Sequence, residues 1–179
     1  MTDATINNQQ GRLYSWLAGL IDGDGTLCMT KTVCSREKYP QYKEDKMHIR
    51  LTLKIEMADE STIRRCERIF RNMGVHTKMV QRTKRKGYGY YYSVKICGAE
   101  NLSKVLKKLK PYLFTKQKQA KLMLKYIESR KHGNRHKYSD KDLKLIEKMA
   151  QMNKVPSETI RPTPDGEDIV QLIPKGIRL

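Results

Sequence analysis

Residues 17–25, with the sequence LAGLIDGDG, constrain the fold of this chain more than any other segment. If residues 13–22 form a helix, the spacing i, i+3, i+4, i+7 places one stripe of mostly small side chains on a single side: Ser15, Ala18, Gly19 and Asp22. Such a stripe lets a second backbone approach closely. The larger residues of the helix point elsewhere, where we expect them to pack into a core.

Gly23 and Gly25 flank Asp24 and are expected to end the helix, which places Asp24 at a helix terminus. A carboxylate is unfavourable there, because the C-terminal end of a helix carries partial negative charge. A positively charged group should therefore lie near Asp24 and neutralise it. An EF-hand loop starting at Asp22 lacks the residues required at its fifth and sixth positions, and the apolar run is too short for a membrane span. A core helix followed by a solvated Asp-Gly turn stays open on the local pattern.

The nonapeptide resembles the signature of the LAGLIDADG homing endonucleases, DNA-cleaving enzymes usually encoded within introns. Only Gly23 departs from the name motif, at a position where the family commonly accepts glycine. The resemblance implies that the small-faced helices of two domains or subunits pack together. It also implies that Asp24 binds an essential divalent metal with help from the Gly23 carbonyl, the metal being Mg²⁺ with Mn²⁺ as a substitute. Asp22 is expected to organise the junction instead.

Two further catalytic residues follow from the same resemblance. The stretch PYLFTKQKQA resembles the segment that carries a basic residue beside the metal site, and this residue is Lys116. A solvated lysine in the first turn of a helix is the alternative. Family members also use a polar side chain near the end of the second strand to order water. The corresponding residues here are Glu56 and Met57, and because methionine cannot do this, Glu56 or another residue must.

The composition indicates a polyanionic partner. The formal net charge is +18, from 37 Lys and Arg against 19 Asp and Glu, and nucleic acid is the first candidate. No signal peptide or lipidation motif is visible, so we expect no membrane partner and an intracellular location, cytoplasmic or organellar. The four cysteines form no C-x-x-C pair and have no histidine at zinc-like spacing. They are interpreted as buried thiols, and a disulfide stays open.

Alternating polar and apolar residues predict strands at 26–33 and 48–57, each with one face toward a core. A helix is predicted at 59–73, followed by a hairpin at 75–96 with a basic tip. Residues on the outward faces are expected to contact duplex DNA, with arginine best matched to guanine: Thr30, Thr32, His48, Arg50, Lys54, Arg82, Lys84, Tyr90 and Tyr92. Around the hairpin tip a register shift of one residue would reverse the face. The alternative there is a solvated hairpin whose tyrosines pack within the sheet.

Three more helices are predicted, at 99–110, at 115–130 with Thr115 as N-cap, and at 139–152 with Ser139 as N-cap. The resulting order favours an α+β fold, an αββαββα core whose antiparallel sheet forms a DNA-binding saddle with helices on one face. This is also the arrangement of the family. We expect a loose arm at 1–10, a core domain at 11–130, and a basic helix with an extended tail at 131–179.

The sequence contains one copy of the signature and no internal duplication. A homodimer would cover the small stripe with its own copy and bring two Asp24 carboxylates to the two-fold axis. The predicted function is therefore a site-specific, intron-encoded endonuclease that hydrolyses both strands of a long pseudo-palindromic DNA target. The alternative is a non-cleaving binder on the same scaffold, either a DNA-binding regulator or a maturase with intron RNA as partner.

Overall fold

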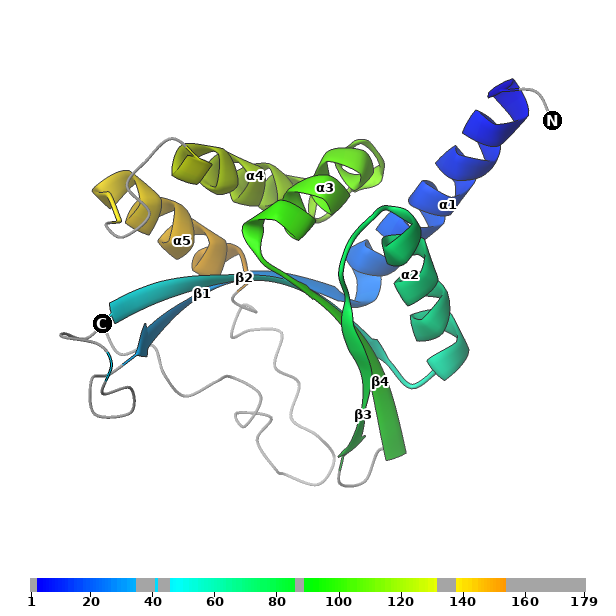
Figure 1. The fold of residues 1–179 in the computed structure, drawn as a ribbon, viewed down its shortest axis with the longest axis horizontal. Coiled ribbons are helices and arrows are strands. Elements are labelled where there is room, and N and C mark those ends of the chain that lie inside the picture. The colour runs from blue at the N-terminus through cyan, green and yellow to red at the C-terminus, as the bar shows by residue number, and fades with distance from the viewer. Residues whose placement is uncertain (1–2, 35–40, 42–45, 86–88, 132–137, 154–179) are drawn as a thin grey trace.

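The computed structural model of the chain describes residues 3–34, 41, 46–85, 89–131 and 138–153. Helices and strands follow in the predicted α+β order (Figure 1): α1 Asp3–Asp24, β1 Gly25–Cys34, β2 Lys46–Met57, α2 Glu60–Asn72, β3 Lys78–Arg85, β4 Gly89–Cys97, α3 Ala99–Leu109, the 3₁₀ helix η1 Lys110–Tyr112, α4 Gln117–Lys131 and α5 Asp140–Met152. The tail at 154–179 lies outside the described residues, so its predicted extended form stays a prediction.

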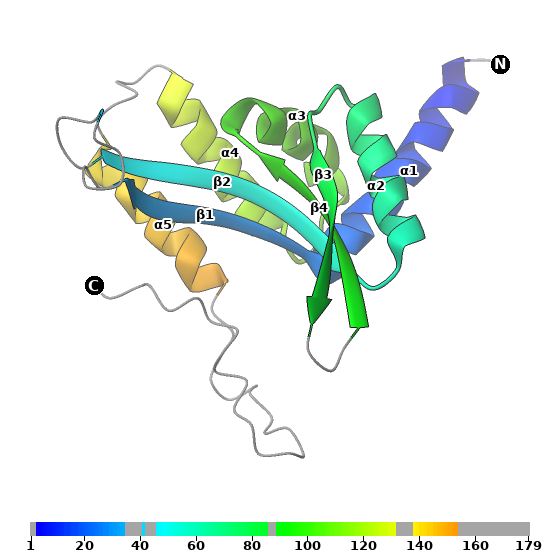
Figure 2. The same cartoon turned by 60° about the horizontal axis from the view of Figure 1, so that its bottom comes forward.

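The four strands form one antiparallel sheet in the order β1-β2-β4-β3. All the described helices lie over one face, and the sheet curves away from them, so that its other face is concave (Figures 1 and 2). None of the described helices covers this concave face, which we call the open face. Apolar positions of the strands and helices meet between the two layers, with these residues almost fully buried: Leu27, Leu53, Ile55, Ile63, Phe70, Val94, Ile96, Leu102, Leu106 and Met123. The predicted saddle of sheet and helices is confirmed.

Helix α1 is longer than predicted at both ends. Residues 3–10 continue the helix, so the prediction of a loose arm is wrong for them, and the N-terminal half of α1 extends away from the rest of the molecule (Figures 1 and 2). At the other end the helix runs through Gly23 to Asp24 and passes directly into β1. Gly25 permits this by close contact, because a Cβ there would lie 2.6 Å from the carbonyl oxygen of Ile21. Its φ is not in the left-handed region.

Local sequence signals fix the ends of α2 and α5 as predicted. Asp59 caps α2 by accepting hydrogen bonds from the backbone N–H groups of Ser61 and Thr62. Gly74 follows the helix with φ of +72°. Ser139 caps α5 in a reciprocal capping box with Asp142. Both helices therefore begin at the residues that the sequence indicates.

Asp142 also ties α5 to α4. It accepts a hydrogen bond from Ser129 and forms an ion pair with Arg130, whose guanidinium stacks on the ring of Tyr138. Burial raises the pKa of the Asp142 carboxyl, but the hydrogen bonds from Ser139 and Ser129 and the charge of Arg130 outweigh burial and hold that pKa below its ordinary value. The two helices pack as a pair beside β1.

Among the described residues no helix is long and apolar enough to cross a membrane. Cys28, Cys66 and Cys97 are free thiols. Only Cys66 is fully buried, and burial raises the pKa of its thiol to about 11. The interpretation of the cysteines as buried thiols is therefore confirmed for Cys66, whereas Cys28 and Cys97 are partly exposed.

Candidate active site and nucleic-acid face

Asp22 joins the end of α1 to the beginning of α4. Its carboxylate accepts hydrogen bonds from the backbone N–H groups of Phe114, at 2.7 Å, and Lys116, at 2.8 Å, and from the hydroxyl of Thr115, at 2.9 Å. Its backbone carbonyl, one of the unpaired carbonyls of the last turn of α1, accepts from the Lys116 ammonium. We call this set of contacts the Asp22 clasp.

The clasp resolves the electrostatic conflict at the end of α1. The partially positive N-terminus of α4 and the Lys116 ammonium face the negative end of α1, so each helix terminus neutralises the other. Thr115 donates its hydroxyl proton to Asp22, so the prediction that Thr115 is the N-cap of α4 is wrong. The carboxylate that serves this helix start comes from a residue distant in sequence, which no local spacing could indicate.

The clasp makes stability depend on pH. Partial burial raises the pKa of Asp22, but the hydrogen bonds from Phe114, Lys116 and Thr115 outweigh burial and hold that pKa below its ordinary value of 3.8. A lowered pKa stabilises the folded state above 3.8, and this stabilisation is lost as pH falls through the folded pKa. We expect the stability advantage of the wild type over Asp22→Asn to shrink between about pH 5 and about pH 2 in urea titrations. A constant difference over this range would contradict the assignment.

Asp24 lies two residues after Asp22 and faces solvent. Within the described ranges no hydrogen bond reaches its carboxylate, although Lys116 is close enough to feel its charge. Burial lowers the pKa of the Lys116 ammonium, and the negative charges of Asp22 and Asp24 offset only part of this effect. The two acids of the signature thus have separate environments, one bound into the fold and one exposed beside a lysine.

The residues around Asp24 fit a hydrated divalent cation. The described part of the chain contains no group of three or more His, Cys, Asp or Glu side chains that could enclose a metal. One exposed carboxylate at a helix C-terminus, where backbone carbonyls are unpaired, matches the sparse protein ligation that Mg²⁺ accepts when substrate phosphate supplies further oxygens. Asp24 and the carbonyl of Gly23 are the candidate ligands.

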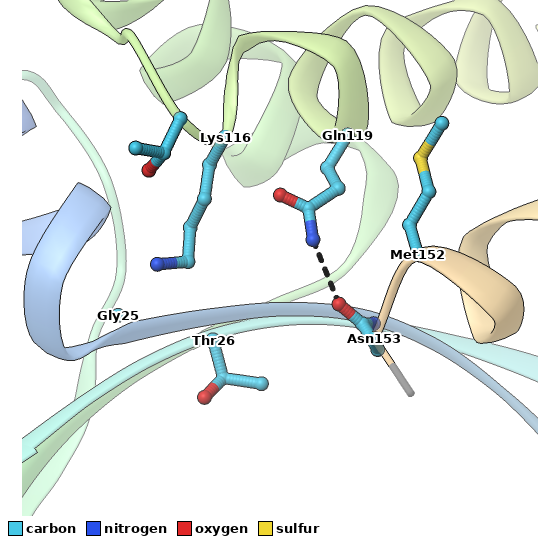
Figure 3. Close-up of a pocket in the computed structure, with 7 residues that line it drawn as sticks. Gly25, Thr26, Lys116, Gln119, Met152 and Asn153 are labelled. Atoms are coloured by element: carbon cyan, nitrogen blue, oxygen red, sulfur yellow. Dashed lines mark hydrogen bonds between the residues drawn. The ribbon is translucent and has the colours of Figure 1, made fainter. Parts of the chain in front are cut away.

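A pocket of about 380 Å³ opens beside Lys116 at the edge of β1 (Figure 3). It is lined by residues of β1, the start of α4 and the end of α5: Gly25, Thr26, Thr115, Lys116, Gln119, Met152 and Asn153. The structure therefore supports Lys116 as a residue of the candidate site. The sequence analysis did not identify Gln119, which is three residues after Lys116, or Asn153, which the packing of α5 brings to the same pocket.

Glu56 lies on the open face of the sheet. It forms an ion pair with Lys54, two positions earlier on the same face. Gly25 at the start of β1 is opposite Ile55, so Glu56 lies just beyond the point where α1 joins the sheet. Met57 alternates to the other face and packs against the core. The catalytic role of Glu56 stays a prediction.

The strand register confirms the outward face of β1 and β2. Thr30 is opposite Arg50 and Thr32 is opposite His48, while Lys54 lies between Thr26 of β1 and Lys95 of β4. Residues directly opposite in an antiparallel pair share a face. These side chains therefore line the concave face that the helices leave open, and basic groups recur across it.

The register corrects the prediction for the hairpin. Tyr92 is opposite Met57 and packs against the core, so its outward placement is wrong. Tyr90 has the same parity as Tyr92 and is 43% exposed near the end of the ribbon. Tyr91, which the sequence analysis did not select, is the tyrosine that shares the open face with Ser93 and Lys95. An error of one residue in the register around the hairpin tip caused the exchange.

In β3, the backbone positions of Arg82 and Lys84 are opposite Tyr92 and Tyr90 of β4, respectively. A register irregularity separates Lys78 from Gln81 in the same strand. The side chains of residues 79–88 lie outside the described set, and the DNA contacts predicted for Arg82 and Lys84 remain predictions.

The exposed side of α1 differs from the predicted stripe. Ser15 and Gly19 are exposed as expected, but Ala18 is fully buried in the core of its own chain and Asp22 belongs to the clasp. The four residues of the predicted stripe span about 100° around the helix axis. Ala18, at one edge of this arc, faces the core of its own chain. Gly23 is exposed with Ser15 and Gly19, so the small exposed stripe is shifted by part of a turn.

Comparison with known proteins agrees with this geometry. The family profile described as LAGLIDADG endonuclease matches residues 17–129. The DNA endonuclease I-CvuI of Chlorella vulgaris is 32% identical over 115 residues, which cover 64% of this chain and 63% of that protein. Its crystal structure in complex with its target aligns with a TM-score of 0.54 at 25% identity, over 83% of this chain and 87% of that one. The chain thus spans less than two thirds of its curated relative in the sequence match.

A more distant relative shares the fold. The archaeal intron-encoded homing endonuclease I-Vdi141I, solved in complex with DNA, aligns with a TM-score of 0.60 over 82% of this chain and 87% of that one. At 12% identity the likeness concerns the fold alone.

Proposed function

Since this chain belongs to the LAGLIDADG endonuclease family, we propose that it is a site-specific, intron-encoded homing endonuclease that hydrolyses both strands of a long pseudo-palindromic DNA target. The single observation that carries the proposal is the division of labour between the two acids of the signature. Asp22 is committed to the clasp, whereas Asp24 is exposed beside Lys116. A purely structural signature would not need the second, exposed carboxylate.

The open face of the sheet supports duplex DNA as the substrate. This face is concave (Figure 1), and its basic side chains complement the negative charge of a phosphate backbone: Arg50, His48, Lys54 and Lys95. Arginine and threonine on this face offer hydrogen bonds to base edges in the major groove. The DNA complex of I-CvuI supports the same kind of partner.

The chemistry proposed for the site is hydrolysis of a phosphodiester by water. Asp24 and the Gly23 carbonyl would hold a divalent ion, Mg²⁺ with Mn²⁺ as a substitute. When bound, the ion activates the water and stabilises charge on the leaving oxygen. The Lys116 ammonium, fixed by its bond to the Asp22 carbonyl, places a positive charge where a scissile phosphate gains negative charge. The I-CvuI structures were obtained in the presence of Ca and of Mg, which supports the use of a divalent metal; the DNA in the Mg structure, a target of I-CreI, is not cleaved.

A homodimer completes the proposed site. One chain supplies one exposed Asp24, so a two-strand cut needs a second copy. An exposed apolar group beside the stripe supports an interface there: Phe114, whose backbone N–H belongs to the clasp, is 90% exposed. A Cβ at Gly19 would meet nothing within 4 Å in the single chain, so the fold of one chain does not require glycine at this position.

The dimer proposal predicts a specific effect of Gly19→Leu. The added side chain has open space in the single chain, so the fold should be retained, but it would separate two helices packed across this stripe. We expect the wild type to sediment at twice the 20.9 kDa chain mass at micromolar concentration and Gly19→Leu to sediment as a monomer. Lys107→Leu on the exposed side of α3 is the matched control. A monomeric wild type, or a dimeric Gly19→Leu, would contradict this interface.

The nuclease proposal is tested by incubating the protein with Mg²⁺ and either a library of long duplexes or the intronless version of its host locus. We expect cleavage of both strands at one sequence, and none when EDTA removes the metal. Absence of cutting with any divalent ion, combined with retained specific binding, would favour the alternative of a non-cleaving DNA-binding regulator or RNA maturase.

A further inference from the structure

Gln119 and Asn153 form a chain of amide groups beside Lys116 that the proposed chemistry has not used (Figure 3). The Nδ2 group of Asn153 donates to the backbone carbonyl of Leu27 in β1, at 2.8 Å. The Nε2 group of Gln119 donates to the Oδ1 atom of Asn153, also at 2.8 Å. The three groups of this hydrogen-bonded chain come from α4, from the C-cap of α5 and from β1.

The backbone carbonyl of Leu27 fixes the direction of both amides. A carbonyl can only accept, so Asn153 must turn its NH₂ group toward Leu27 and its oxygen toward Gln119. Gln119 must then turn its own NH₂ group toward Asn153. The Oε1 atom of Gln119 is left as an acceptor, and among the described residues no donor reaches it. In Figure 3 this oxygen is turned toward the side of the pocket where Lys116 lies.

The pocket around this acceptor has room for ordered water. Its volume of about 380 Å³ is several times the roughly 30 Å³ that one water occupies in the liquid. Lys116 supplies donors and Gln119 supplies an acceptor to the same space. A water between them would have hydrogen-bonding partners of both kinds, as an ordered water requires.

Met57 lies where the family resemblance implies a polar side chain that orders water, and the acceptor of Gln119 can take this role. Its side chain packs against the core, and Glu56 is engaged with Lys54 on the open face. We propose that Gln119, oriented by Asn153, is the residue that positions water in the pocket beside Lys116 for the hydrolysis. Asn153 acts only through Gln119 and is a positioning residue. This inference rests on the proposed nuclease function.

The first test is Gln119→Leu, which keeps the bulk of the side chain and removes the acceptor. We expect the single-turnover cleavage rate to fall on the order of 10²-fold, because misplacing a reactant by about 1 Å can slow a reaction by this factor. Affinity for duplex DNA should be retained. The matched control is Gln117→Leu, two residues earlier on α4. The side chain of Gln117 donates to the Lys110 carbonyl and does not line the pocket. Equal rates for wild type and Gln119→Leu would overturn the inference while leaving the nuclease proposal intact.

The coupling of the two residues is tested by a double-mutant cycle. If Asn153 acts through Gln119, then Asn153→Ala should slow cleavage, and adding it to Gln119→Leu should slow cleavage no further. Asn153→Asp should also slow cleavage, because a carboxylate cannot donate to the Leu27 carbonyl that orients this side chain. Independent, multiplying losses in the double variant would overturn the positioning role of Asn153.

A readout without metal or cleavage completes the test. A high-resolution crystal structure of the metal-free protein should show an ordered water on Gln119 Oε1, and the Gln119→Leu structure should lack it. An empty position in the wild type would overturn the inference. Absence of cleavage by the wild type itself would overturn the nuclease proposal and with it the role of this water.

Discussion

Asp24→Asn should lower the rate of DNA cleavage by on the order of 10³-fold or more while leaving specific DNA binding measurable. The substitution removes one negative charge and keeps the size of the side chain. Because Asp24 is exposed and no hydrogen bond reaches it within the described ranges, the fold does not depend on its charge. The rate should be measured in single-turnover assays with Mg²⁺ and the affinity by fluorescence anisotropy on the same duplex.

The stability of Asp24→Asn provides the internal check. Removing a carboxylate from the negative end of α1 should change the free energy of unfolding by no more than about 0.5 kcal/mol. Asp140→Asn, an exposed acid in the first turn of α5, is the matched control and should leave cleavage unchanged. Parallel loss of cleavage, binding and stability in Asp24→Asn would mean that Asp24 is structural.

Asp22→Ala should produce the opposite pattern, a large loss of stability. The substitution leaves the N–H groups of Phe114 and Lys116 without their acceptor, and the hydroxyl of Thr115 keeps only the longer hydrogen bond to the backbone carbonyl of residue 22. Loss of a helix cap costs about 0.5 to 2 kcal/mol, and the additional charge-assisted bonds bring the expected loss to about 2 to 3 kcal/mol. Urea denaturation of the wild type, Asp22→Ala and Asp24→Asn measures it.

Cleavage by Asp22→Ala should also fall, because the backbone N–H of Lys116 loses its hydrogen bond to the Asp22 carboxylate. Water can replace part of the lost contacts, since several of them are exposed. The loss of cleavage should therefore be smaller than for Asp24→Asn, at a temperature where both variants are folded. A stable Asp22→Ala with cleavage as weak as that of Asp24→Asn would reverse the roles assigned to the two acids.

Elements with strong local signals could be predicted from the sequence. The alternation in β2, the cap of α2 at Asp59 and the capping box of Ser139 each depend on neighbours within a few residues. The choice between Asp22 and Asp24 was also accessible, because one acid lies inside the helix and the other at its end. Lys116 came from a family resemblance, and the structure places it beside both acids.

Features that depend on tertiary packing could not be predicted. The burial of Ala18 depends on which edge of α1 the core occupies, and periodicity alone does not decide this. The face of Tyr92 depends on the register of a hairpin whose tip offers glycine on both sides of a tyrosine. Gln119 and Asn153 are separated by 34 residues and meet only because α5 folds back on α4.

The direct passage from α1 into β1 ties two functions to one rigid segment. Gly25 rests against the backbone of Ile21, so no flexible residues separate the exposed stripe of the helix from the first strand of the open face. In the proposed dimer, the distance between the two α1 helices would then set the stagger between the cuts on the two strands. The strand residues would set which sequence is read. A change in the packing of α1 would therefore also move β1, so cut geometry and sequence preference could not be redesigned independently.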